Sequence, residues 1–484
     1  MRAGLFVCEN STHIDSVATP EDALFRILTF CLSMSIAALS PAQAQTVPQS
    51  MAQIQLSYAP LVKQAAPGVV NIYAQRVVAE RRNPFADDPF FGDLFRNFGQ
   101  TTPRVQNSLG SGVIVGSDGL VVSNYHVVGQ ATEIRVVLSD RREFAAEVVL
   151  TDEQSDLAVL QLQGARDLPA LSLADSDGAE VGDLVLAIGN PFGVGQTVSS
   201  GIISGLARSG IAVGSGRGYF LQTDAPINPG NSGGALVNMA GELVGVNTAI
   251  ITRSGGSNGI GFAIPANLVA QVVSQARDGR ERFQRPWAGV TAQAMDAALA
   301  DAFDQTIPAG VVLLELHPDS PLAKAGLQRG DVILSVDGGE VNSAPEMMFR
   351  LAAKGIGGQS VLEARRGTDS REVTIDLIAP PESPERQTRR IDARSALAGL
   401  EVMRINPAVI AEFGLSPDAD GILVTQAQDL AGRVGLRPGD VLLAINGEPV
   451  QSTADVARLS RAQTRAWVIE LIREGRQLSL RFRL

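Results

Sequence analysis

Residues 230–234 read Gly-Asn-Ser-Gly-Gly, and Ser-Asn-Tyr-His-Val-Val lies upstream at 123–128. A serine hydroxyl is a poor nucleophile until a base takes its proton, and a third group must orient that base. The chain has only three histidines, each in a different segment: His13, His126 and His317. The pattern therefore predicts that His126 is the general base for Ser232.

A carboxylate that could orient the imidazole lies in Ser-Asp-Leu-Ala-Val-Leu, residues 155–160. We expect Asp156 to hold the His126 ring and to stabilise its protonated form. The chain order His126, Asp156, Ser232 is that of chymotrypsin-like serine proteases. The glycines around Ser232 allow a tight turn, and the backbone N–H groups of Gly230 and Ser232 are expected to form an oxyanion hole.

Residues 66–265 consist of short β-branched runs separated by glycine-rich turns. Strands are expected at 112–115, 120–123, 134–138, 147–150, 157–162, 184–188 and 242–246. Many short strands with few helical stretches favour antiparallel β-barrels, and about 200 residues suffice for two of them. His126 and Asp156 fall in the first half and Ser232 in the second, so a cleft between two barrels would unite them.

Two other interpretations of the Ser232 segment stay open. The segment could be an ordinary glycine-rich turn, because the chain contains 49 glycines. It also matches the Gly-x-Ser-x-Gly elbow of α/β-hydrolases, which requires a helix after the serine and an acid and a histidine later in the chain. After Ser232 only His317 is available, and 233–246 has the pattern of a β-hairpin.

The composition describes a globular chain of several domains. Its 484 residues suggest roughly three domains. Hydrophobic residues make up 45% and charged residues 19%, and the net charge of −11 comes without a basic cluster. Nucleic acid is therefore not expected as a partner. No run of about 18 apolar residues occurs, so no transmembrane segment is expected in the mature chain.

The N-terminal region has the pattern of an export signal. A short apolar core at 27–39 follows Arg26 and ends in an Ala-x-Ala-type cleavage site after Ala44. Acidic residues at 21 and 22 are unusual before such a core and favour a true start near Leu24. Both cysteines, Cys8 and Cys31, lie in this presequence, so disulfides and thiolate metal sites are not expected in the mature protein.

The C-terminal half repeats itself. Residues 325–334, Ala-Gly-Leu-Gln-Arg-Gly-Asp-Val-Ile-Leu, recur at 434–443 as Val-Gly-Leu-Arg-Pro-Gly-Asp-Val-Leu-Leu, an offset of 109 residues. Two copies of one module follow from this repeat. The expected organisation is a signal peptide at 1–44, a catalytic domain at 45–277, a linker at 278–286, modules at 287–379 and 395–484, and a linker at 380–394 between the modules.

The mature chain resembles the Deg/HtrA (high-temperature-requirement) periplasmic serine proteases over essentially its whole length. The motifs that carry the resemblance are those at 109–115, 123–128, 155–160, 189–193, 222–236, 247–251 and 259–265, followed by two PDZ-like modules. The resemblance implies a mainly β fold, with a trypsin-like double six-stranded β-barrel followed by two PDZ domains. It also implies the triad His126, Asp156 and Ser232.

The same resemblance assigns the substrate-binding residues. They would be Asn231, Ile227, Thr248, Ala249, Ile250, Ile251 and Thr252. The isoleucines would make a small apolar pocket that favours Val or Ala at the cleaved position, a preference of modest discrimination because one methylene is worth about 1–3 kcal/mol. No cofactor and no metal are expected.

Three further regions carry regulatory expectations. Trp287, Ala288, Gly289 and Val290 match the loop with which a PDZ domain holds a peptide carboxylate, and Leu397–Leu400 resembles it in the second copy. Arg208 matches a sensor-loop arginine, with a solvated surface arginine as the alternative. The phenylalanine-rich segment 81–106 corresponds to a flap that covers active sites between subunits, with an unstructured loop as the alternative.

The expected function is that of an exported, ATP-independent serine endopeptidase that degrades unfolded proteins in the periplasm, regulated by PDZ peptide binding. A homo-oligomer, a trimer or multiples of it, is the expected assembly. The alternative from another functional class is a chaperone or scaffold with little proteolysis.

Overall fold

The computed structural model describes residues 57–82, 100–190, 195–208, 212–213, 216–217, 219–228, 230–250, 259–303, 305–391 and 395–483. The expected signal peptide and the phenylalanine-rich stretch at 83–99 therefore lie outside the described residues. Within the described ranges, no helix is both long and apolar enough to cross a membrane.

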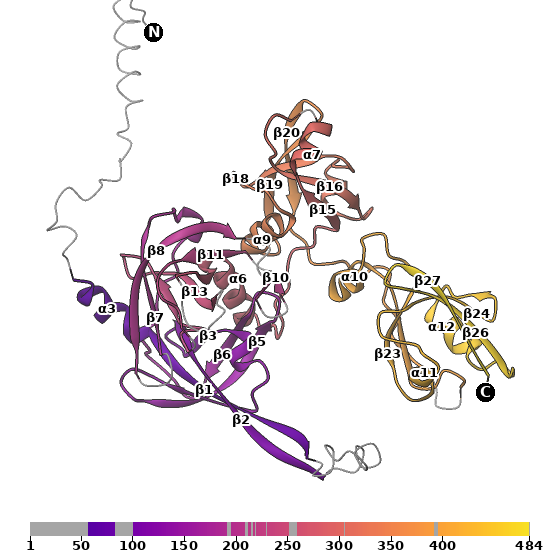
Figure 1. Ribbon diagram of the computed structural model, residues 1–484, viewed down its shortest axis with the longest axis horizontal. Helices are drawn as coiled ribbons and strands as arrows, with labels where there is room; N and C mark the ends of the chain where they lie inside the picture. The colour runs from indigo at the N-terminus through magenta and orange to yellow at the C-terminus, as the bar shows by residue number, and fades with distance from the viewer. Residues whose placement is uncertain are drawn as a thin grey trace, which may run out of the picture. The chain divides into compact units, whose positions relative to one another are not determined.

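Six strands close the first β-barrel, in the order β1-β2-β3-β6-β5-β4 (Figure 1). After the helical turns α3 (Ala59–Ala65) and η1 (Ala66–Gly68), they are β1 (Val69–Arg82), β2 (Gln100–Gly116), β3 (Leu120–Ser123), β4 (Glu133–Val137), β5 (Glu143–Asp152) and β6 (Leu157–Leu162). Fully buried aliphatic side chains such as Ile72, Ile114 and Leu160 fill its interior. The one-turn helix α5 (Tyr125–Val128) follows β3 directly.

A second closed barrel has the order β11-β14-β13-β12-β7-β8. Its strands are β7 (Leu184–Gly189), β8 (Thr197–Arg208), β11 (Phe220–Thr223), β12 (Ala235–Val237), β13 (Leu243–Ile250) and β14 (Gly261–Pro265), with η2 (Ser176–Gly178) before them and a two-stranded ribbon of β9 (Ala212–Val213) and β10 (Gly216–Arg217) beside them. Helix α6 (Ala266–Arg277) follows and buries Leu268, Val269 and Val272. The expected double six-stranded barrel is confirmed.

Each repeat builds one sheet with short helices. The first has β15 (Val290–Ala294), α7 (Ala297–Ala302), β16 (Val311–Leu316), α8 (Pro321–Lys324), β17 (Val332–Val336), β18 (Gly339–Glu340), α9 (Ala344–Lys354), β19 (Gln359–Arg366) and β20 (Asp369–Asp376). Its sheet order is β15-β16-β17-β19-β20, with β18 paired to β17.

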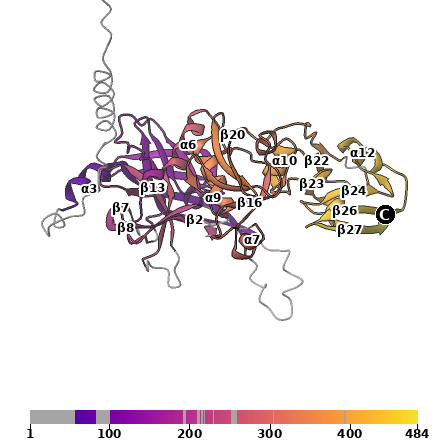
Figure 2. The same cartoon turned by 90° about the horizontal axis from the view of Figure 1, so that it is seen from above.

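The second repeat has the same series of elements with one strand added. It consists of β21 (Arg389–Arg390), β22 (Leu400–Arg404), α10 (Pro407–Phe413), β23 (Ile422–Ala427), α11 (Asp429–Arg433), β24 (Val441–Ile445), β25 (Glu448–Pro449), α12 (Thr453–Leu459), β26 (Ala466–Arg473) and β27 (Arg476–Arg483). Its order is β21-β22-β23-β24-β26-β27, and β24, β26 and β27 lie side by side in both views (Figures 1 and 2).

The repeated Gly-Asp pair has a structural reason. Asp331 is 1% exposed and accepts two hydrogen bonds from Arg366, at 2.6 and 2.7 Å. Asp440 is fully buried and accepts the equivalent pair from Arg473, at 2.7 and 2.8 Å. Two-pronged guanidinium–carboxylate bonds are strong and directional. Each module therefore ties the turn before its central strand to its C-terminal hairpin.

We predict that Asp331→Asn lowers the stability of the first module by about 1.5–3 kcal/mol, because charge-assisted hydrogen bonds are lost. Burial favours the neutral carboxyl, but hydrogen bonds from Arg366 and the Gln328 N–H outweigh it, so the pKa of Asp331 lies below its ordinary value. The stability from this shift is complete above the ordinary Asp pKa of about 3.9 and is lost as pH falls through the lowered value.

Hydrogen exchange across residues 287–379 as a function of pH measures this effect. Asp369→Asn, at an exposed position of β20, is the matched control. Equal protection in the two variants near neutral pH would contradict the anchoring role of Asp331.

Candidate active site

The first barrel places His126 against Asp156 by three hydrogen bonds. The Tyr125 N–H donates to the Asp156 backbone carbonyl at 3.1 Å, and the His126 N–H donates to Asp156 Oδ1 at 3.0 Å. Between the side chains, His126 Nδ1 lies 2.7 Å from Asp156 Oδ2. Because α5 follows β3 and Asp156 immediately precedes β6, the pairing of those two strands brings both residues together.

The two side chains differ in exposure. The His126 side chain is 48% exposed, whereas the Asp156 side chain is 6% exposed. Asp156 also has φ of 58°, a left-handed conformation that is uncommon for a residue other than glycine. A buried carboxylate at Nδ1 leaves Nε2 of a half-exposed ring free to exchange protons with a substrate.

Thr248 connects this pair to the predicted nucleophile in the second barrel. Its hydroxyl donates to Asp156 Oδ2 at 2.6 Å, and its backbone carbonyl accepts the Ser232 hydroxyl at 3.1 Å. The described structure therefore gathers the three predicted residues around one threonine. In this conformation the Ser232 hydroxyl donates to the Thr248 carbonyl and not to the imidazole.

The turn that carries Ser232 depends on glycine at two positions. Gly230 has φ of 100° and Gly233 has φ of 81°. A Cβ at Gly233 would also lie 2.2 Å from the Ser111 carbonyl oxygen. Within the described residues, the N–H groups of Gly230 and Ser232 have no hydrogen-bond acceptor. These are the two N–H groups predicted to bind an oxyanion, and we propose that role for them.

Ser111, on β2, is a residue of the site that sequence reasoning did not single out. Its hydroxyl donates to the Gly230 carbonyl at 2.7 Å and accepts the Asn190 N–H at 2.9 Å. Its backbone N–H donates to the Ser232 carbonyl at 2.9 Å. One fully buried residue thus holds the carbonyls of both residues that are predicted to supply the oxyanion donors. Its only sequence signal was its place in the 109–115 motif.

The predicted pocket residues are described in part. Ile227 is 1% exposed and Thr248 3%, and Asn231 is 1% exposed with its side chain directed at Gly189. Ala249 and Ile250 lie on β13, but their side chains, and all of Ile251 and Thr252, fall outside the described residues. Arg208 ends β8, and its side chain also falls outside them.

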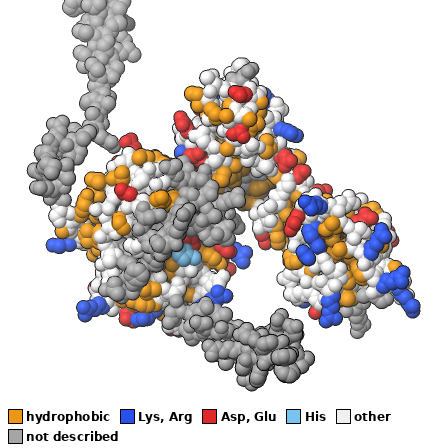
Figure 3. Space-filling model, in the orientation of Figure 1, with side chains coloured by type: hydrophobic (Ala, Val, Ile, Leu, Met, Phe, Trp, Pro, Cys, Tyr) orange, Lys and Arg blue, Asp and Glu red, His pale blue; other side chains and the backbone are white. Residues whose placement is uncertain are grey.

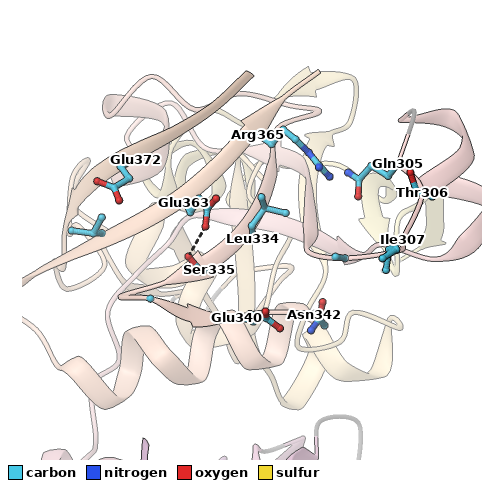
Figure 4. Close-up of a pocket in the computed structure, with 13 residues that line it drawn as sticks. Gln305, Thr306, Ile307, Leu334, Ser335, Glu340, Asn342, Glu363, Arg365 and Glu372 are labelled. Atoms are coloured by element: carbon cyan, nitrogen blue, oxygen red, sulfur yellow. Dashed lines mark hydrogen bonds between the residues drawn. The ribbon is translucent and has the colours of Figure 1, made fainter. Parts of the chain in front are cut away.

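A cavity of about 710 Å³ lies elsewhere, in the first module (Figure 4). Glu340, Glu363, Glu372 and Arg365 line it, and the Ser335 hydroxyl donates to Glu363 at 3.3 Å. No histidine is among the described residues of its wall, so the only group that Ser335 bonds there is the Glu363 carboxylate. The cavity is not a second candidate for nucleophilic chemistry.

Comparison with known proteins agrees with this geometry. A family model described as a trypsin-like peptidase domain matches residues 110–246, and two described as PDZ domains match 282–377 and 423–474. A Haemophilus influenzae protein described as a probable periplasmic serine protease do/HhoA-like is 37% identical, covering 89% of this chain and 92% of its own. The chain belongs to the Deg/HtrA family of serine proteases.

Other Deg/HtrA members are similar over most of the chain. The periplasmic pH-dependent serine endoprotease DegQ of Escherichia coli is 35% identical, covering 95% of this chain and 99% of its own. A solved structure of the HtrA-type protease AlgW with a decapeptide is 39% identical, with a TM-score of 0.50 over 67% of this chain and 99% of that chain. The predicted family, fold class and serine protease activity are confirmed.

The α/β-hydrolase interpretation of the Ser232 motif is wrong. β12 and β13 form an antiparallel hairpin after Ser232, where that fold requires a helix. Within the first PDZ domain, His317 packs its ring edge-on against Trp287, with centroids 5.3 Å apart. This contact places His317 in the PDZ domain, after β16 and against the loop 287–290 that was predicted to bind a carboxylate.

We predict that Ser111→Ala lowers kcat about 10- to 100-fold with little change in KM. Loss of one oxyanion donor costs about 10²–10³ in rate, and here the donors lose their positioning but remain present. Peptide cleavage kinetics and binding of a peptide boronate, which mimics the tetrahedral intermediate, measure the effect.

Ser176→Ala is the control, because Ser176 is also buried, at 5% exposed, and its hydroxyl accepts the Asn267 N–H instead of bonding Gly230 or Ser232. The positioning role is wrong if the two variants have the same kcat.

Proposed function

We propose that the chain is an exported, ATP-independent endopeptidase of the periplasm that degrades unfolded or damaged proteins. The observation that carries this proposal is the convergence of His126, Asp156 and Ser232 on Thr248. Relatives whose names place them in the periplasm support the location. The expected signal at 1–44 agrees with export.

The geometry supports a two-step acyl-transfer mechanism. The Ser232 hydroxyl turns from the Thr248 carbonyl to His126, which takes its proton as Ser232 attacks a peptide carbonyl. The N–H groups of Gly230 and Ser232 stabilise the resulting oxyanion, and Asp156 stabilises the protonated imidazole. His126 then protonates the leaving amine and activates a water that hydrolyses the acyl-enzyme.

The proposal includes regulation by chain ends. Gly289 has φ of 63°, a conformation that glycine adopts freely, and it opens the turn into β15. Such turns expose successive N–H groups that hold a peptide carboxylate, while the neighbouring strand pairs with the peptide backbone. The AlgW structure, which contains a bound decapeptide, supports peptide recognition in this family. We further propose that the assembly is a homotrimer or a multiple of one and that Arg208 relays peptide binding to the active site.

Ser232→Ala is predicted to abolish digestion of unfolded casein, because removal of a triad serine leaves no nucleophile. Electrophoresis over time with equal amounts of folded wild type and variant measures the loss of substrate. Equal digestion by both proteins would reject the protease proposal. Retained suppression of casein aggregation by the variant would add a chaperone role.

Ile227 is predicted to limit the size of the side chain accepted before the cleaved bond. A peptide library is expected to be cut mainly after Val or Ala, and Ile227→Ala is expected to raise cleavage after Leu about 10-fold or more, since one or two methylenes are worth about 1–3 kcal/mol each. Cleavage mainly after Lys or Phe by the wild type would overturn the pocket assignment.

A further inference from the structure

The two PDZ domains differ at the strand edge where a peptide would add. In the first domain β15 ends the sheet, and within the described residues its only strand partner is β16. In the second domain the corresponding strand, β22, pairs with β23 on one side and with β21 on the other. The added strand β21 comes from the segment that joins the two domains.

β21 runs antiparallel to β22 in the direction that a peptide ligand would take. Arg389 is opposite Val402, and Arg390 is opposite Glu401. The next residue, Ile391, donates its N–H to the Leu400 carbonyl at 2.8 Å. The chain therefore advances toward the loop Leu397–Leu400, which resembles a carboxylate-binding loop.

Ile391 fills an apolar site in the second domain. It is 4% exposed and belongs to the same buried cluster as Leu397, Leu400 and Val456 of α12. The side chain of a bound peptide's last residue must enter an apolar space at this end of the groove, between strand and helix. Ile391 occupies such a space with the chain's own side chain.

The preceding residues are fastened to the same domain. The Arg404 N–H donates to the Arg386 carbonyl at 2.6 Å, and the Asn406 amide donates to the Pro384 carbonyl at 2.7 Å. The Ala408 N–H donates to the Pro381 carbonyl at 3.1 Å. Together with β21, these bonds hold the joining segment along β22 and the start of α10.

The opposite edge of this sheet is protected in another way. β27 is the last strand, and Arg476, Arg481 and Arg483 on it are exposed. Basic side chains are spread over the second domain in Figure 3. Charged residues on an edge strand oppose the addition of a further chain. One edge is thus charged, and the other is already paired.

We propose that residues 389–391 are an internal ligand of the second PDZ domain. They satisfy the backbone groups of β22 and bury Ile391 where a peptide's terminal side chain would lie, so chain ends from outside bind to the first PDZ domain alone. This inference rests on the proposed function, in which the first PDZ domain binds chain ends.

Binding stoichiometry tests the proposal. The probe is a fluorescent heptapeptide with an apolar C-terminal residue and a free carboxylate, titrated calorimetrically into full-length Ser232→Ala protein. One peptide per chain is expected. Adding Ile391→Asp, which makes burial of the anchor unfavourable, is expected to give two, whereas Ile391→Val keeps the apolar anchor and is expected to give one. Two peptides per chain without the Ile391→Asp change would overturn the proposal.

Hydrogen exchange on the Ser232→Ala protein without changes at Ile391 gives a second measurement that does not depend on how Ile391→Asp folds. Saturating peptide is expected to protect β15 and to leave exchange in 389–391 unchanged. Faster exchange in 389–391 would show displacement and overturn the inference. No binding and no protection of β15 would instead reject the proposed peptide recognition by the first PDZ domain.

Discussion

The hydrogen bond from the Thr248 hydroxyl to the Asp156 carboxylate, at 2.6 Å, joins the two barrels at the point where the chemistry is proposed to occur. Asp156 belongs to the first barrel and Thr248 to the second, and neither barrel alone contains a complete site. A buried carboxylate is costly unless its oxygens are hydrogen-bonded. Here the imidazole, a backbone N–H and this hydroxyl share that task, so the pairing of the barrels completes the hydrogen bonding of the Asp156 carboxylate.

Ser111 makes the second connection between the barrels. It reaches from the first barrel to the carbonyls of Gly230 and Ser232 in the second. A turn with glycine at positive φ is free to rotate in isolation, since it has no Cβ to restrict it. The neighbouring strand therefore holds the proposed oxyanion donors in position, and the glycines allow the turn to adopt that conformation.

The sequence predicted the features that local pattern determines. The strands at 120–123 and 157–162 were predicted with their observed bounds. His126, Asp156 and Ser232 could be named because the chain offers few histidines and because the motifs around them match a family. The sequence could not predict that Ser111 bonds Gly230 or that the Thr248 hydroxyl bonds Asp156. The two residues of each pair lie more than 90 positions apart in the sequence.

Strand β21 was not predicted from the sequence, for a different reason. It has two residues, both arginines, in a stretch rich in charge and proline, and its pairing comes entirely from β22.

The attachment of the joining segment to both PDZ domains limits how far the second domain can move from the first. The Ile378 carbonyl is bonded to the first domain through Trp287, and the Pro381 carbonyl is bonded to the second through Ala408. Only Ala379 and Pro380 lie between these anchor points, a tether of about 11 Å at full extension. The joining segment has the composition of a long flexible linker, but only a short part of it connects the two domains freely. Because this connection is short, each domain has a high effective concentration near the other.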